Sequence, residues 1–97
     1  MTTKVEFELH HVDSGIIYIP KEATCLFPFD LNFQVKSNAA PDQLTVKGNP
    51  AKPTHNKPHI HLKNTNWFKI NQGALKDGYK LIIEITQSKG CKQYYLK

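Results

Sequence analysis

Lysine and histidine side chains are concentrated in one stretch of this 97-residue chain that contains no carboxylate. The stretch runs from Gln43 to Lys76 and carries six lysines and three histidines. Positive charge gathered on one surface attracts a phosphate polymer, because lysine–phosphate contacts release condensed counterions. The window therefore predicts a nucleic acid as the partner, with an ordinary solvated basic face as the alternative. Its basic residues are Lys47, Lys52, Lys57, Lys63, Lys69, Lys76, His55, His59 and His61.

Two of these histidines have a spacing that suits metal chelation. His59 and His61 are two residues apart, so on a strand they point to the same face, and His55 or His10 would have to supply a third ligand. No third ligand has a compelling spacing, and we expect surface or packing roles, with no metal and no cofactor. Because histidine titrates near neutral pH, the five histidines also predict a DNA affinity that rises as the pH falls.

Catalytic patterns in the chain are incomplete. Residues 55–59 are superficially similar to a histidine-asparagine-histidine nuclease motif, but their compact spacing leaves no room for its two strands and helix. Asp42 and Glu84 resemble the acidic pair of restriction nucleases, yet the lysine expected shortly after the second acid is replaced by Thr86. Metal-assisted phosphodiester cleavage requires carboxylates that are scarce here. We therefore expect no enzyme activity, and any catalysis would lie in a separate nuclease domain or subunit.

Length and composition predict a single domain over residues 1–97 with one core. No apolar run approaches the roughly 18 residues of a membrane span, and the N-terminus lacks a secretory signal. These features predict a cytoplasmic protein that does not enter a membrane. Cys25 and Cys91 have no CxxC spacing, so two reduced thiols are favoured over a disulfide.

Hydrophobic alternation predicts a mainly β chain with seven short strands and two short helices, arranged as a small barrel or sandwich. The strands are expected at residues 5–9, 16–19, 31–36, 44–47, 59–62, 80–85 and 93–96, and the helices at 21–27 and 66–71. Trp67 and Phe68 have a functional interpretation as a stacking platform, but packing in the core is favoured. Alternation also places one of Tyr94 and Tyr95 inside and the other outside.

Several passages occur in an order that resembles a known family. The matching passages are Gly15–Lys21, Leu26–Pro28, His59–Asn64, Trp67–Lys69, Leu75–Gly78 and Leu81–Glu84. Together they span roughly residues 10 to 86 and are similar to the B-three DNA-binding domain of plant transcription factors, which also serves as the DNA-recognition domain of some restriction endonucleases. The resemblance implies a seven-stranded open pseudobarrel with two short helices. It also implies a role as the specificity domain of a restriction-type system or as a small regulator.

The resemblance further implies that two loops, at about residues 10–15 and 50–59, hold double-stranded DNA in the major groove. The first loop would contribute His10, His11, Asp13 and Ser14, with Lys21 at its base. The second would contribute Lys52, Thr54, His55, Asn56, Lys57 and His59.

Side-chain chemistry then assigns roles within this set. Lys21, Lys47, Lys52, Lys57 and Lys63 suit phosphates, where a flexible point charge suffices. Asn56 suits adenine, and Thr54 or Ser14 suits a base or a phosphate. Guanine readout by arginine is excluded because the chain contains thirteen lysines and no arginine. The rival interpretations are a protein-interaction barrel whose basic face meets an acidic partner, and a metal-dependent enzyme built on the histidines.

Overall fold

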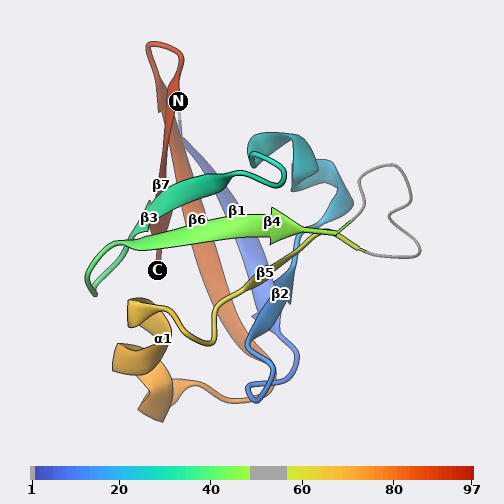
Figure 1. Ribbon diagram of the computed structural model, residues 1–97, viewed down its shortest axis with the longest axis vertical. Coiled ribbons are helices and arrows are strands. Elements are labelled where there is room, and N and C mark those ends of the chain that lie inside the picture. Colours follow the sequence, from blue (N-terminus) through green and yellow to red (C-terminus); the bar gives the residue numbers. More distant parts are fainter. Residues whose placement is uncertain (1, 49–56) are drawn as a thin grey trace.

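The computed structural model describes residues 2–48 and 57–97, and in these residues seven strands form one open sheet (Figure 1). The strand order is β1-β6-β7-β3-β4-β5-β2, and neighbours are antiparallel except β3 and β7, which are parallel. The prediction of a mainly β, seven-stranded chain is confirmed. The strands are β1 (Thr2–Leu9), β2 (Ile16–Tyr18), β3 (Asn32–Lys36), β4 (Asp42–Lys47), β5 (His59–His61), β6 (Tyr79–Ser88) and β7 (Cys91–Leu96).

Three short helical segments connect the strands. Helix η1 (Lys21–Leu26) is a 3-10 helix that begins after Pro20, and α1 (Asn66–Asn71) runs directly into the 3-10 turn η2 (Gln72–Ala74). Both helices expected from the sequence are present. Helix α1 begins at Thr65, whose hydroxyl accepts a hydrogen bond from the Phe68 N–H at 3.1 Å. No helix in the described part of the chain is both long and apolar enough to cross a membrane.

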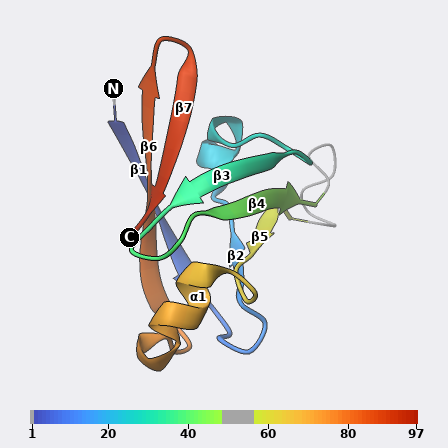
Figure 2. The same ribbon diagram turned by 60° about the vertical axis from the view of Figure 1, so that its left-hand side comes forward.

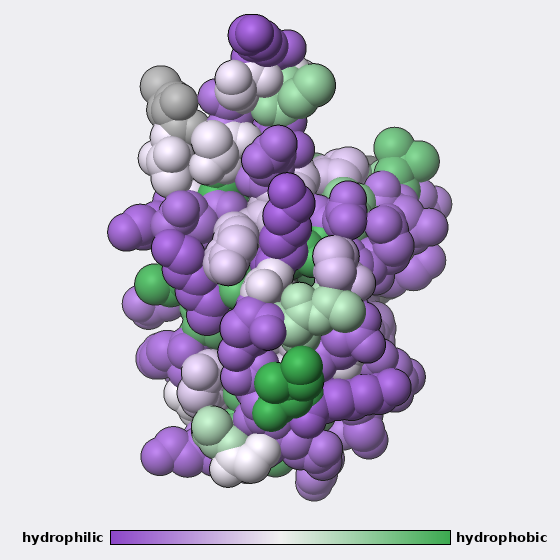
Figure 3. Space-filling view, turned by 90° about the vertical axis from the view of Figure 1, so that its left-hand side faces the viewer, coloured by the Kyte–Doolittle hydropathy of each residue, from purple (hydrophilic) through white to green (hydrophobic). Residues whose placement is uncertain are grey.

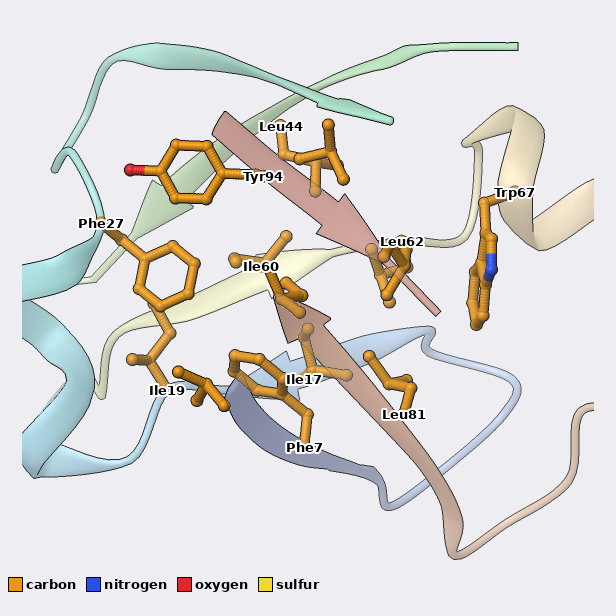
Figure 4. Close-up of a cluster of buried hydrophobic side chains, with 14 of the residues drawn as sticks. Phe7, Ile17, Ile19, Phe27, Leu44, Ile60, Leu62, Trp67, Leu81 and Tyr94 are labelled. Atoms are coloured by element: carbon orange, nitrogen blue, oxygen red, sulfur yellow. The ribbon is translucent and has the colours of Figure 1, made fainter. Parts of the chain in front are cut away.

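The sheet curls so that its inner face encloses the core, with β1, β6 and β7 on one side and β3, β4, β5 and β2 on the other (Figure 2). Alternation along the strands fills this core, because every second residue of β1 and β6 points inward. In Figure 4 the rings of Phe27 and Tyr94 lie next to each other at one end of the cluster; the rings are stacked, and their centroids are 5.6 Å apart. The ends of the sheet, β1 and β2, flank its opening.

Several side chains confirm the sequence-based burial pattern. Trp67 and Phe68 are 2 % and 5 % exposed, so they pack in the core as favoured over the stacking role. Tyr94 is buried while Tyr95 is exposed, as alternation requires. Cys25 and Cys91 are free and exposed, in agreement with the prediction of two thiols.

The start of the third strand differs from the prediction. Leu31 was expected to alternate with Phe33 and Val35 on the inner face, but it precedes β3 and is 66 % exposed. The cause lies at Asp30, which has a φ of 59° and donates its N–H to the Val46 carbonyl at 3.1 Å. The left-handed residue turns the chain, so that alternation begins only at Asn32.

Candidate nucleic-acid interface

Strand β5 and the residues that flank it carry a row of four nitrogen-bearing side chains on the outer face of the sheet. Pro58, Ile60 and Leu62 are buried, while the residues alternating with them point outward. Two of the outward residues are lysines and two are histidines. We call this set the β5 row: Lys57, His59, His61 and Lys63. In the described part of the chain, no member of the row pairs with a carboxylate.

The β1–β2 loop, residues 10–15, packs at the Lys63 end of this row. The Leu62 N–H donates to the Gly15 carbonyl at 2.7 Å, and the β2–β5 pairing continues from Ile16 opposite His61. The loop is fixed on its other side by Asp77, whose Oδ1 accepts from the Val12 N–H at 2.8 Å. Residues 10–15 are therefore held by one hydrogen bond to Leu62, which follows β5, and by another to Asp77.

The opposite end of the row adjoins three further elements. The Ile19 N–H donates to the Pro58 carbonyl at 3.0 Å, which brings the start of η1 beside Lys57. Lys47, the last residue of β4, pairs with His59 in the sheet register. Gly48 and Lys57, which flank residues 49–56, therefore lie at the end of β5 away from the β1–β2 loop (Figure 1).

Rings line the outer face between these two ends. Tyr18 is 45 % exposed and lies opposite His59 in the register, with ring centroids 6.0 Å apart. The ring of His10 is 6.2 Å from Tyr18 on its other side. Tyr18 was not among the predicted DNA contacts, because only the β2–β5 pairing brings it beside His59. His61 was counted in the basic window but not among the loop contacts, although alternation places it on the same face as His59.

Two carboxylates reduce the positive charge near the edges of this face. Asp30 lies 3.6 Å from the Lys47 ammonium, and Glu8 lies 3.0 Å from Nδ1 of His10. Glu8 also accepts a hydrogen bond from Lys80 at 2.6 Å, which lowers the pKa of the Glu8 carboxyl and raises the pKa of the Lys80 ammonium. Lys57 and Lys63 of the β5 row, in contrast, have no carboxylate partner in the described chain.

The first-loop residues predicted from the sequence lie together at the surface. His10, His11, Asp13 and Ser14 are all exposed, and the Ser14 hydroxyl donates to the His11 carbonyl at 3.0 Å. A hollow of about 400 Å³ opens beside this loop. Ser14, His61 and Lys63 line it together with the carboxylate of Asp42 and neighbouring polar residues.

The remaining predicted residues divide into two groups. Lys21 is exposed at the start of η1, which places it at the Lys57 end of β2 rather than at the base of the first loop. Lys47, Lys57 and His59 also lie at that end. Lys52, Thr54, His55 and Asn56 lie outside the described residues.

The two carboxylates considered as a nuclease pair have structural partners. Asp42 accepts hydrogen bonds from the backbone N–H groups of Asn66 at 2.8 Å and Trp67 at 3.2 Å, at the start of α1. Glu84 accepts a hydrogen bond from the Lys97 ammonium at 3.0 Å. In residues 2–48 and 57–97, no three histidine, cysteine or carboxylate side chains gather closely enough to hold a metal ion together.

The face of the molecule opposite to the β5 row has the mixed hydropathy of an ordinary protein surface. In Figure 3, which views the molecule from the left-hand side of Figure 1, hydrophilic residues predominate and apolar ones occur singly or in small groups. The exposed large apolar side chains of the described chain are Tyr18, Leu31, Ile70 and Tyr95. Of these, only Tyr18 lies on the interface.

Comparison of the chain with protein-family models, with curated proteins and with solved structures gave no match.

Proposed function

We propose that this chain binds double-stranded DNA through the β5 row and the two loops that flank it. The main support for this proposal is the β5 row. It presents two lysines and two histidines on one outward face, and no member is paired with a carboxylate in the described chain. Cations placed in a line suit a polymer with regularly spaced phosphates. The binding role is that of a specificity domain in a restriction-type system or of a small regulator, with any cleavage carried by a separate domain or subunit.

The dimensions of the row support this proposal. Lys57 and Lys63 are six residue steps apart, and only His59–His61 between them is strand, so at about 3.3 Å per residue the row spans at most about 20 Å. Phosphates of one DNA strand recur every 3.4 Å or so along the helix axis, so the two ends of the row are farther apart than neighbouring phosphates. Its two terminal lysines can therefore contact separate phosphates while the histidines and Tyr18 lie between them.

The arrangement of the loops supports the same function. Residues 10–15 lie at one end of the β2–β5 pair, and Gly48 and Lys57, the described residues on either side of the second predicted loop, lie at the other end, as a two-loop grip on a groove would require. The seven-stranded open sheet is also compatible with the pseudobarrel of the B-three type. We infer that this pseudobarrel, and its mode of holding the major groove, apply to this chain.

Fluorescence anisotropy of a randomised duplex and of a matched single strand tests the proposal. With phosphate contacts from the four described lysines assigned to this role, Lys21, Lys47, Lys57 and Lys63, duplex affinity should fall about 150-fold between roughly 50 and 200 mM salt. Duplex-preferred binding with this salt dependence is the expected result. Absence of duplex binding at the lower salt would overturn the proposal and favour an acidic protein partner for the same row, and a preference for the single strand would overturn the duplex assignment.

A further inference from the structure

The two histidines of the β5 row form a close pair. His59 and His61 lie on the same outer face of β5, because Ile60 between them points into the core. Their ring centroids are 5.0 Å apart, and the ring planes are inclined at 74°. Their mutual position can be compared with that of two imidazoles bound to one metal ion.

The distance between the two ring centroids can be compared with the distance expected for two imidazoles on one zinc ion. A zinc ion bound about 2 Å beyond a ring nitrogen lies about 3.2 Å from the centre of that ring. Two such rings at a tetrahedral angle around one ion have centroids about 5.2 Å apart, and at a right angle about 4.5 Å apart. The observed separation falls between these values. The separation of the two rings is thus that expected for two imidazoles that share one ion.

The hydrogen bond made by Nδ1 of His59 leaves Nε2 available to bind a metal ion. Its Nδ1 lies 2.7 Å from the Lys57 carbonyl oxygen. Because a carbonyl can only accept, Nδ1 carries the proton, and the lone pair of the neutral ring is on Nε2. Metal-binding histidines commonly donate their second ring N–H to a backbone carbonyl, which orients the ring and raises the basicity of the coordinating nitrogen.

We propose that His59 and His61 together bind a divalent transition-metal ion of the zinc class, with water in the other coordination positions. Imidazole nitrogens suit zinc, copper and nickel ions. His61 is exposed and His59 is half-buried, so an ion reaches the pair from solvent. The described residues supply no third ligand. This proposal does not depend on DNA binding by the chain.

Isothermal titration of the full chain with Zn²⁺ in a non-coordinating buffer near neutral pH tests the site. Cys25 and Cys91 are exposed thiols, and because thiolates are zinc ligands in general, all proteins in the titration carry Cys25→Ser and Cys91→Ser. We expect one equivalent of Zn²⁺ to bind. Both His59→Ala and His61→Ala should weaken binding at least tenfold. Absence of binding, or unchanged affinity in either variant, would overturn the proposal.

His10 provides a matched control. It is an exposed histidine beside Tyr18, and its Nδ1 lies 3.0 Å from Glu8, but it is outside the pair. His10→Ala should change Zn²⁺ affinity less than twofold, and an equal loss in this variant would mean scattered binding to surface histidines.

A second measurement and a second variant distinguish the loss of a metal ligand from a folding defect. In nitrogen NMR spectra, Zn²⁺ should shift Nε2 of His59 and leave Nδ1 protonated, and ligation at Nδ1 would contradict the assignment. Should His59→Ala disturb folding, His59→Gln replaces it and should also lose binding tenfold.

Discussion

Gly15 and Lys63 lie so close together that a β-carbon on Gly15 would fall 2.8 Å from the β-carbon of Lys63. Gly15 also has a φ of 62°, a conformation that residues with a side chain rarely adopt. The contact joins the β1–β2 loop to the end of the β5 row. The position of the first loop relative to the row thus depends on the absence of a side chain at residue 15.

Gly15→Ala should lower the free energy of unfolding by at least about 2 kcal/mol, because it combines left-handed strain with a clash against β5. Urea denaturation measures the change. Gly90→Ala is the matched control, since Gly90 has a φ of 79° but open space around it. Gly73→Ala, with neither feature, should be nearly neutral. If Gly15→Ala lowered the free energy of unfolding no more than Gly90→Ala does, the close approach of Gly15 to Lys63 would not affect stability.

Asp77→Ala should lower the free energy of unfolding by about 1 kcal/mol, because the Val12 N–H loses its acceptor. Asp77→Asn should cost less, since an amide oxygen still accepts. Asp13→Ala controls for the change of charge, because Asp13 is exposed in the same loop and no partner for it is seen in the described chain. Equal stability of Asp77→Ala and Asp13→Ala in urea denaturation would contradict the anchoring role.

The strands were predictable where inward and outward residues alternate over several positions. In β1 and β6 the apolar residues Val5, Phe7, Leu81 and Ile83 recur at every second position, and this pattern alone defines both strands. Leu31 shows the limit of the method, because a left-handed residue before the strand changes the local direction of the chain without changing the pattern of residue types.

The β5 row was only partly predictable. His59 and His61 could be placed on one face, but Pro58 suggested that pairing stops there, whereas its carbonyl accepts from Ile19 and alternation continues to Lys57. The position of Tyr18 beside His59 depends on a pairing between strands about 40 residues apart. No local pattern encodes such a partner, because it is selected by the packing of the whole sheet.

Tyr94 should make the fold sensitive to alkaline pH. Burial raises the pKa of its hydroxyl, which donates to the Leu26 carbonyl at 2.9 Å. Below about pH 10 the phenol is neutral in both states, so its contribution to stability is complete. As the pH rises further, the unfolded chain loses the proton first and the folded state loses stability.

Tyr94→Phe should therefore cost about 1 kcal/mol at pH 7, through the lost hydrogen bond, and this deficit should shrink above about pH 10. Urea denaturation from pH 7 to 11 measures the difference from the parent chain. Tyr95→Phe is the neighbouring control, because Tyr95 is exposed. A deficit of Tyr94→Phe that stays constant up to pH 11 would contradict the prediction.

Removing both lysines of the β5 row should change the salt dependence of duplex binding as well as its strength. Each phosphate contact contributes about 0.9 to the slope of log affinity against log salt concentration, so Lys57→Ala with Lys63→Ala should reduce the slope by about 1.8. Alanine keeps the β-carbon of residue 63 that packs beside Gly15, so the loop contact is retained. Anisotropy at several salt concentrations gives the slope.

The matched double variant is Lys89→Ala with Lys92→Ala, at the β6–β7 hairpin tip far from the β1–β2 loop (Figure 1). Both double variants lower the net charge from +5 to +3, so a general effect of charge would change both slopes equally. A local contact predicts that only the β5 variant changes its slope. Because counterion release counts contacts and not total charge, this comparison separates a DNA-binding row from a solvated basic face.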